Sequence, residues 1–222
     1  MLDSTQPIAR LVLDHSECAA VLQRHRIDYC CNGQLSLEEA AKARGVDLAL
    51  VLGELEVAMK QRLPEDGQPD LRHLDTAQLV DRARTHFHDP LHRTLPFVRA
   101  LSAKVKRVHG DRSPSLAELD ARLSELTAAL LSHLEAESTQ LFPALLSGVP
   151  ATALLTEAKN DHHGVRVLLE RVREAADDFE PPAWACNSYR TLFSELKWLE
   201  HDVFALMHLE NHVLLPRFGH EQ

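Results

Sequence analysis

The sequence predicts an all-helical protein in which a small helical domain precedes an antiparallel four-helix bundle. Apolar residues recur at the 3.6-residue period of an α-helix along almost the whole chain, and no stretch of regular apolar alternation bounded by turn residues stands out. Turn-forming residues gather at a few places and leave long periodic stretches joined by short turns. Long helices with short connections favour an up-and-down bundle.

The N-terminal part is predicted to form three short helices, because a candidate capping residue precedes each of them. Ser16 is a candidate N-cap for the first helix. Ser36 and Glu39 have the spacing of a capping box for the second, Gly45 ends that helix, and Asp47 is placed to cap the third. A piece this short has a thin core, so we expect a small domain.

The segment PEDGQPD, residues 64–70, contains turn-forming residues throughout and is expected to be a linker. This divides the chain into a small helical domain at 1–63 and a bundle at 71–222. The four bundle helices are predicted to begin near Asp75, Ser115, Ala151 and Ala183.

The composition excludes several classes of protein. The 222 residues include 33 acidic and 24 basic side chains, a net charge of −9, with no long basic run to follow a phosphate backbone, so we expect no nucleic acid partner. No run of about 18 apolar residues and no secretory signal is found, so we expect no membrane span and a cytoplasmic location. The four cysteines are too sparse for a disulfide framework.

Histidine is unusually frequent, with 14 residues, which points to metal ligands. In the second bundle helix, His133 and Glu137 lie one turn apart and therefore on the same face. In the fourth, Glu210 falls in an apolar stripe, six residues before Pro216, as Glu137 lies six before Pro143. Two inward carboxylates with histidines beside them suit a dinuclear iron or manganese site.

The first and third bundle helices add further histidines to this set. In the third helix either His162 or His163 could point inward, and His162 shares a face with apolar residues. In the first, His88 and His92 are i, i+4 neighbours. A histidine or glutamate cluster on every helix of the bundle favours one shared metal site.

Six motifs occur along the chain in this order: DYCCNG, FHDPLHRTLP, VKRVHG, SHLEAESTQLFP, NDHHG and LENHVLLPR. With this ordered set, the chain resembles the di-iron proteins that repair iron-sulfur clusters. That family has a short cysteine-bearing N-terminal domain and a hemerythrin-like four-helix bundle, and the resemblance covers nearly the whole chain. It implies two iron ions as the cofactor, with the two glutamates bridging them. The implied ligands are His88, His133, Glu137, His162 and Glu210.

One family ligand is missing from this chain. The family has a histidine one turn before the last glutamate, where this sequence has Leu206. The first and fourth helices are antiparallel, so one turn towards the N-terminus on the fourth matches one turn towards the C-terminus on the first. We therefore hypothesise that His92, one turn after His88, supplies the missing imidazole. The alternatives are a water ligand, or a local bulge that turns His208 inward.

His109, in VKRVHG, matches a family histidine but lies too far along the chain to share a site with His88. The 21 residues between them span about 31 Å of straight helix. We therefore interpret His109 as a helix-end histidine, and Cys186 and Cys18 as ordinary helix residues.

Cys30 and Cys31 fall in a predicted turn and are expected to be accessible to solvent. Adjacent accessible thiols can be oxidised or bind a metal transiently, and the nearby cations Arg24, His25 and Arg26 are placed to activate them. The family resemblance implies that this pair takes part in redox and iron handling, so both cysteines are candidate functional residues.

The resemblance implies a stress-response protein that helps repair iron-sulfur clusters damaged by nitric oxide or oxidants, with damaged iron-sulfur proteins as partners. Two alternatives share the same centre: a hemerythrin-like carrier or scavenger of NO or O2, and a di-iron enzyme that reduces NO or peroxide. A homodimer is compatible with each of these functions.

Overall fold

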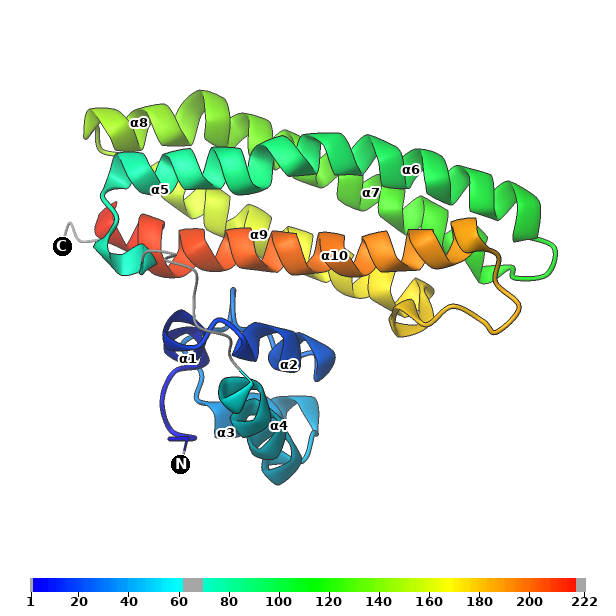
Figure 1. Ribbon diagram of the computed structural model, residues 1–222. Coiled ribbons are helices and arrows are strands. Elements are labelled where there is room, and N and C mark those ends of the chain that lie inside the picture. Colours follow the sequence, from blue (N-terminus) through cyan, green and yellow to red (C-terminus); the bar gives the residue numbers. More distant parts are fainter. Residues whose placement is uncertain (1, 62–69, 219–222) are drawn as a thin grey trace. The chain divides into compact units, whose positions relative to one another are not determined.

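The computed structural model describes residues 2–61 and 70–218 and confirms the all-helical fold (Figure 1). Its contacts divide the chain into two compact units. The first contains the described residues up to Asp75 together with Met207–Arg217, and the second contains Thr76–Leu206 with Phe218. The expected linker at 64–70 lies outside the described residues, apart from Asp70.

The first unit has one helix more than the sequence predicts. The helices are α1 (Ile8–Asp14), α2 (Cys18–Arg24), α3 (Leu37–Arg44) and α4 (Leu48–Lys60), followed by a short 3₁₀ turn, η1 (Leu71–His73). The additional helix, α1, has only seven residues, too few for a clear period, yet it buries Ile8, Leu11 and Val12. Its stability therefore comes from packing rather than from local signals.

The capping signals of α3 and α4 are confirmed. Ser36 and Glu39 form a capping box, Gly45 adopts a left-handed conformation with φ of 68°, and the Asp47 side chain accepts a hydrogen bond from the Ala49 N–H at 2.9 Å. The prediction for Ser16 is wrong, because α2 begins after Glu17 without a side-chain cap. Such caps contribute about 1 kcal/mol each.

The second unit contains the long helices of the bundle. The first pass of the chain is α5 (Thr76–Ala83), a π-helical turn η2 (Arg84–His88) and α6 (Asp89–His109); the second is α7 (Ser115–Ala136), a π-helical turn η3 (Glu137–Leu141) and α8 (Phe142–Ser147). The third is α9 (Thr152–Ala175), followed by a 3₁₀ turn η4 (Asp177–Phe179). The fourth begins as α10 (Asn187–Leu209) and continues into the turns η5 (Glu210–Leu214) and η6 (Leu215–Phe218). The predicted helix starts lie close to these bounds.

The helices pack side by side in an antiparallel arrangement (Figure 1). The helix α7 packs against both α6 and α9. Arg173 of α9 donates a hydrogen bond to Glu200 of α10 at 3.0 Å, and the Lys104 ammonium of α6 lies 3.5 Å from the Ser188 hydroxyl of α10. Each helix thus has two neighbours, which leaves an apolar interior formed mainly by leucines.

The π-helical turns η2, η3 and η5 have a common sequence cause. In each, the turn ends two residues before a proline, which is Pro90, Pro143 or Pro216. A proline inside a helix has no N–H to donate and clashes with the carbonyl four residues before it. A wider turn just ahead of the proline relieves this conflict, and such turns are frequent at functional sites.

Candidate metal centre

Glu137, the first residue of η3, lies at the centre of a buried group of histidines. Its Oε2 lies 3.2 Å from His88 Nε2, while its Oε1 lies 3.4 Å from His133 Nε2 and 3.9 Å from His162 Nε2. The carboxylate is only 2% exposed. The two oxygens of one carboxylate therefore face different histidines.

The histidines of α7 and α9 also face each other. The Nε2 atoms of His133 and His162 lie 3.1 Å apart, with the ring planes nearly perpendicular. Burial lowers the pKa of His133 to about 4, an effect that the charge of Glu137 opposes in part, so its imidazole is neutral at pH 7. Neutral imidazole is the form that binds metals.

Glu210, the first residue of η5, completes the group. It is fully buried, and His133, Glu137, His162 and Glu210 each offer one ligand atom within 4.8 Å of the other three. Imidazole and carboxylate donors suit iron, manganese and zinc, and a cation lying among converging donors removes the cost of burying two carboxylates. The residues therefore fit a metal ion.

Two polar side chains that the sequence analysis missed contact the outer nitrogens of these histidines. Asp161 Oδ2 lies 3.4 Å from His133 Nδ1, and Ser138 Oγ lies 3.3 Å from His88 Nδ1. Such contacts hold an imidazole so that its other nitrogen points at the metal. The signal was present in the sequence, because Asp161 is next to His162 and Ser138 is next to Glu137.

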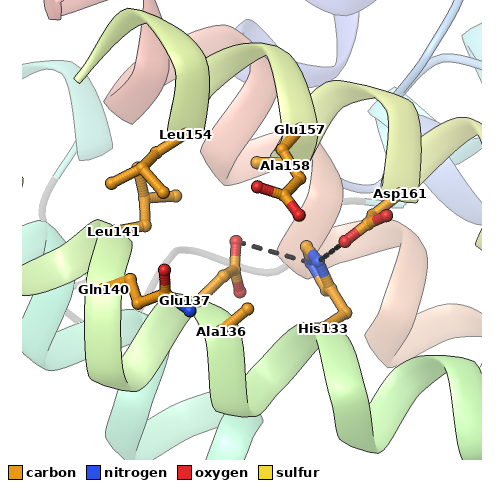
Figure 2. Close-up of a pocket in the computed structure, with 9 residues that line it drawn as sticks. All are labelled: His133, Ala136, Glu137, Gln140, Leu141, Leu154, Glu157, Ala158 and Asp161. Carbon is orange, nitrogen blue, oxygen red and sulfur yellow. Dashed lines mark hydrogen bonds and ion pairs between the residues drawn. The ribbon is translucent and has the colours of Figure 1, made fainter.

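A small pocket reaches this group between α7, η3 and α9 (Figure 2). Its inner wall includes His133 and Glu137, while the carboxylates of Glu157 and Asp161 and the amide of Gln140 line its outer part. Glu157 and Gln140 are exposed. Leu141 and Leu154 line the pocket as well, so a small opening of mixed polar and apolar character leads to the buried centre (Figure 2).

His92 is not brought to this group. It is exposed, whereas His88, Leu91 and Leu95 are buried, so the inward face of α6 passes through residues 91 and 95. The expectation that His88 and His92 share an inward face is therefore wrong. Leu206 is buried and apolar, and the hypothesis that His92 replaces the imidazole missing there gains no support.

His208 does not take that place either. Its ring packs against Tyr29 at 5.2 Å and against His212 at 5.0 Å between ring centroids, within the first unit. Burial lowers the pKa of His208 to about 3, helped by the charge of His212. In the described residues, the position left by the missing histidine is filled by Leu206.

The cysteine pair is less accessible than expected. Cys30 is fully buried and Cys31 is half-buried, with their sulfur atoms 3.7 Å apart. Asp28 Oδ1 accepts hydrogen bonds from the backbone N–H groups of Cys30 and Cys31 at 3.2 and 2.9 Å. Burial, the neighbouring Cys31 thiol and the Asp28 charge raise the pKa of Cys30 well above its usual value. The turn is present, but it is packed inward.

Two of the three cations expected to activate these thiols pair with a carboxylate of α4. Arg24 and His25 pair with Glu54 of α4 at 3.1 and 2.9 Å. The charged group beside the Cys30 sulfur is instead the Asp28 carboxylate, at 3.2 Å, which opposes formation of a thiolate. Asp28, Cys30 and Cys31 nevertheless offer three ligand atoms within 4.8 Å of one another.

The chain was compared with known proteins. Residues 80–218 match the family model of the hemerythrin HHE cation binding domain, and residues 4–59 match ScdA_N, a domain of unknown function. A relative from Staphylococcus haemolyticus, named iron-sulfur cluster repair protein ScdA, is 28% identical, covering 99% of this chain and 100% of its own length. The iron-sulfur cluster repair protein YtfE of an Enterobacter species is 29% identical, covering 96% of both chains.

These matches extend over the motifs on which the resemblance was based, and they cover both units of the structure. The helical bundle, the buried histidines and glutamates and the cysteine pair all fall within the matched residues. The chain therefore belongs to the hemerythrin HHE cation-binding domain family, with an ScdA_N domain ahead of its bundle.

Proposed function

We propose that this protein binds two iron ions and takes part in the repair of damaged iron-sulfur clusters. The observation that carries the proposal is the position of Glu137, whose Oε2 faces His88 while Oε1 faces His133 and His162. A carboxylate with its oxygens directed to separate sets of imidazoles is suited to bridge two metal ions. The relatives named iron-sulfur cluster repair proteins support the choice of function.

In this proposal, His88 holds one iron, His133 and His162 hold the other, and Glu137 and Glu210 contribute carboxylates to both. When bound, the irons supply one-electron redox chemistry and sites for small ligands such as NO, O2 or peroxide. The protein keeps the donors buried, and Asp161 and Ser138 orient His133 and His88 through their Nδ1 atoms.

The two proposed iron positions differ in the number of imidazoles that face them, and this difference favours iron release as part of the function. One imidazole faces Oε2 of Glu137, whereas two face Oε1. Leu206, one turn before Glu210, adds no donor. The position beside His88 would therefore offer fewer imidazole donors, and we expect the chain to hold an iron there more weakly.

Cys30 and Cys31 assist iron transfer or redox cycling in this proposal. Their sulfur atoms and the Asp28 carboxylate are close enough to hold one metal ion together. Cys31 is the accessible member, while Cys30 has to become exposed before it reacts. Damaged iron-sulfur proteins are the macromolecular partners, and the cytoplasm remains the predicted location.

The test is reactivation of an iron-sulfur enzyme, such as aconitase, after damage by NO. The iron-loaded protein is expected to restore activity, and Glu137→Gln or the double change Cys30→Ser with Cys31→Ser is expected to lose this effect. A protein that binds NO reversibly but restores nothing would instead be a carrier. Sustained consumption of NO or peroxide without reactivation would identify a di-iron reductase, and either outcome overturns the repair proposal.

A further inference from the structure

His109 and Cys186 form a close pair that the metal centre does not use. His109 Nε2 lies 3.1 Å from Cys186 Sγ, and Cys186 is exposed. The helix α6 runs without interruption over 21 residues from Asp89 to His109. About 31 Å of helix therefore separates this pair from His88.

The backbone around Cys186 is held in place by a neighbouring arginine. The Arg190 guanidinium donates hydrogen bonds to the carbonyls of Ala183 and Ala185 at 2.8 and 3.0 Å. The Cys186 carbonyl accepts a hydrogen bond from the Arg190 N–H at 3.0 Å, in the first turn of α10. The thiol thus projects from a fixed position at the N-terminal end of α10.

The imidazole of His109 is held equally well. Its ring packs against Trp184 and Tyr189, with centroid distances of 5.8 and 5.7 Å. The Tyr189 hydroxyl lies 3.2 Å from the Ser113 hydroxyl, which fixes this ring relative to the turn between α6 and α7. Both members of the pair are therefore positioned before any reagent arrives.

Two cations contact residues that lie close to Cys186 in the chain. The Arg112 guanidinium lies 4.0 Å from the ring centroid of Trp184, two residues before Cys186, and Lys104 contacts Ser188, two residues after it. Both cations are exposed. Exposed cations near an accessible thiol attract anionic reagents.

We propose that Cys186 and His109 form a reactive thiol–imidazole pair that exchanges with anionic low-molecular-weight disulfides such as glutathione disulfide. His109 Nε2 accepts the thiol proton, and the Cys186 sulfur attacks one sulfur of the disulfide. A new S–S bond forms to Cys186 as the original S–S bond breaks, and the leaving thiolate takes up the proton. No other oxidant or reductant is needed.

The other cysteines are poor competitors for this reaction. Cys18 and Cys30 are buried, and burial raises the pKa of Cys18 to about 12 and that of Cys30 well above its usual value. Cys31 is half-buried. Among the described cysteines, Cys186 combines exposure with a histidine at hydrogen-bond distance.

The first test measures mixed-disulfide formation at each cysteine of the full-length protein with glutathione disulfide at pH 7, by peptide mass spectrometry. Cys186 is expected to react fastest, and His109→Gln is expected to slow it roughly tenfold. His201→Gln, within α10, is the control and should leave the rate unchanged. Equal rates at Cys186 in the wild type and in His109→Gln would overturn the proposal.

The second test separates the roles of charge and of the histidine. Lys104→Gln and Arg112→Gln are expected to slow the reaction with glutathione disulfide but not with the neutral bis(2-hydroxyethyl) disulfide. His109→Gln, or His109→Asn if the first variant unfolds, is expected to slow both. If Lys104→Gln and Arg112→Gln slow the reaction equally with both disulfides, or with neither, the proposed preference for an anionic disulfide is wrong.

Discussion

The carboxylate of Glu137 is almost fully buried among imidazoles, so removal of its charge should be felt directly in metal binding. We predict that Glu137→Gln, which keeps the shape and removes the charge, lowers bound iron by at least one ion per chain. At a free Fe²⁺ concentration about 100 times the Kd, binding to the native state adds about 2.7 kcal/mol of stability, and the variant should lose this gain. Iron analysis and thermal unfolding with and without Fe²⁺ measure both effects.

Glu157→Gln is the matched control, because Glu157 is an exposed acid that lines the same pocket. It is expected to retain the iron content of the wild type. If Glu137→Gln also retains all of its iron, Glu137 is not a bridging ligand.

The buried histidines make the metal-free protein sensitive to acid. The pKa values of His133 and His208 are lowered from 6.5 to about 4 and about 3, mainly by burial. As the pH falls below 6.5, the unfolded chain therefore binds protons that the folded chain does not, and the free energy of unfolding decreases. Each such histidine contributes up to about 1.4 kcal/mol per pH unit.

Urea unfolding of the metal-free protein at pH 7, 6 and 5 measures this loss. His133→Asn should show a shallower decline, since it removes one of the titrating groups. A free energy of unfolding that is constant over this range would contradict the assignment of these imidazoles as buried and neutral.

Leu206 accounts for the proposed difference between the two irons. We predict that a ferrous chelator removes iron in two phases from the wild type, and that Leu206→His slows the fast phase by roughly tenfold, because it adds an imidazole one turn before Glu210. Leu206→Met, of similar volume, is the control. A single phase in the wild type, or no change in Leu206→His, would count against the uneven donor set.

At the scale of the element, prolines place the π-helical turns that carry the glutamates. We predict that Pro143→Ala allows η3 to return to α-helical hydrogen bonding, which rotates Glu137 away from His88 and weakens iron binding. Pro96→Ala is the control, since Pro96 lies inside α6. Iron retention during dialysis compares the two variants, and equal retention would show that the proline does not hold the turn.

Helices and caps that are determined by residues close together in the chain could be predicted from the sequence. The capping box of Ser36 and Glu39 and the starts of the long helices are of this kind. The π-helical turns could not be predicted from a uniform rotation of about 100° per residue. The common offset of Glu137 and Glu210 from their prolines was visible, yet its structural cause was not inferred.

Residues whose role depends on packing could not be placed from the sequence. His92 follows His88 by one turn and is nevertheless exposed, because Leu91 and Leu95 define the inward face. Cys30 lies in a turn, as expected, but the side chains of Asn211 and His212 contact its carbonyl oxygen at 3.0 and 2.9 Å. Long-range contacts of this kind hold the turn in a packed position, and they could not be predicted from the neighbouring residues.

At the scale of the whole molecule, one helical bundle carries two separate groups of reactive side chains. The histidines and Glu137 lie near one end of α6, and the His109–Cys186 pair lies at the other end. The described helices include none long and apolar enough to cross a membrane. The two groups of reactive side chains thus lie in different parts of the bundle, one in its interior and one at its end.

The most direct test of the central claim is the iron content of protein expressed with iron-57, combined with its Mössbauer spectrum. The account predicts two irons per chain that are antiferromagnetically coupled, because both ions of the proposed centre would share the carboxylates of Glu137 and Glu210. One iron or none per chain, or two irons without coupling, would contradict a dinuclear centre bridged by these glutamates.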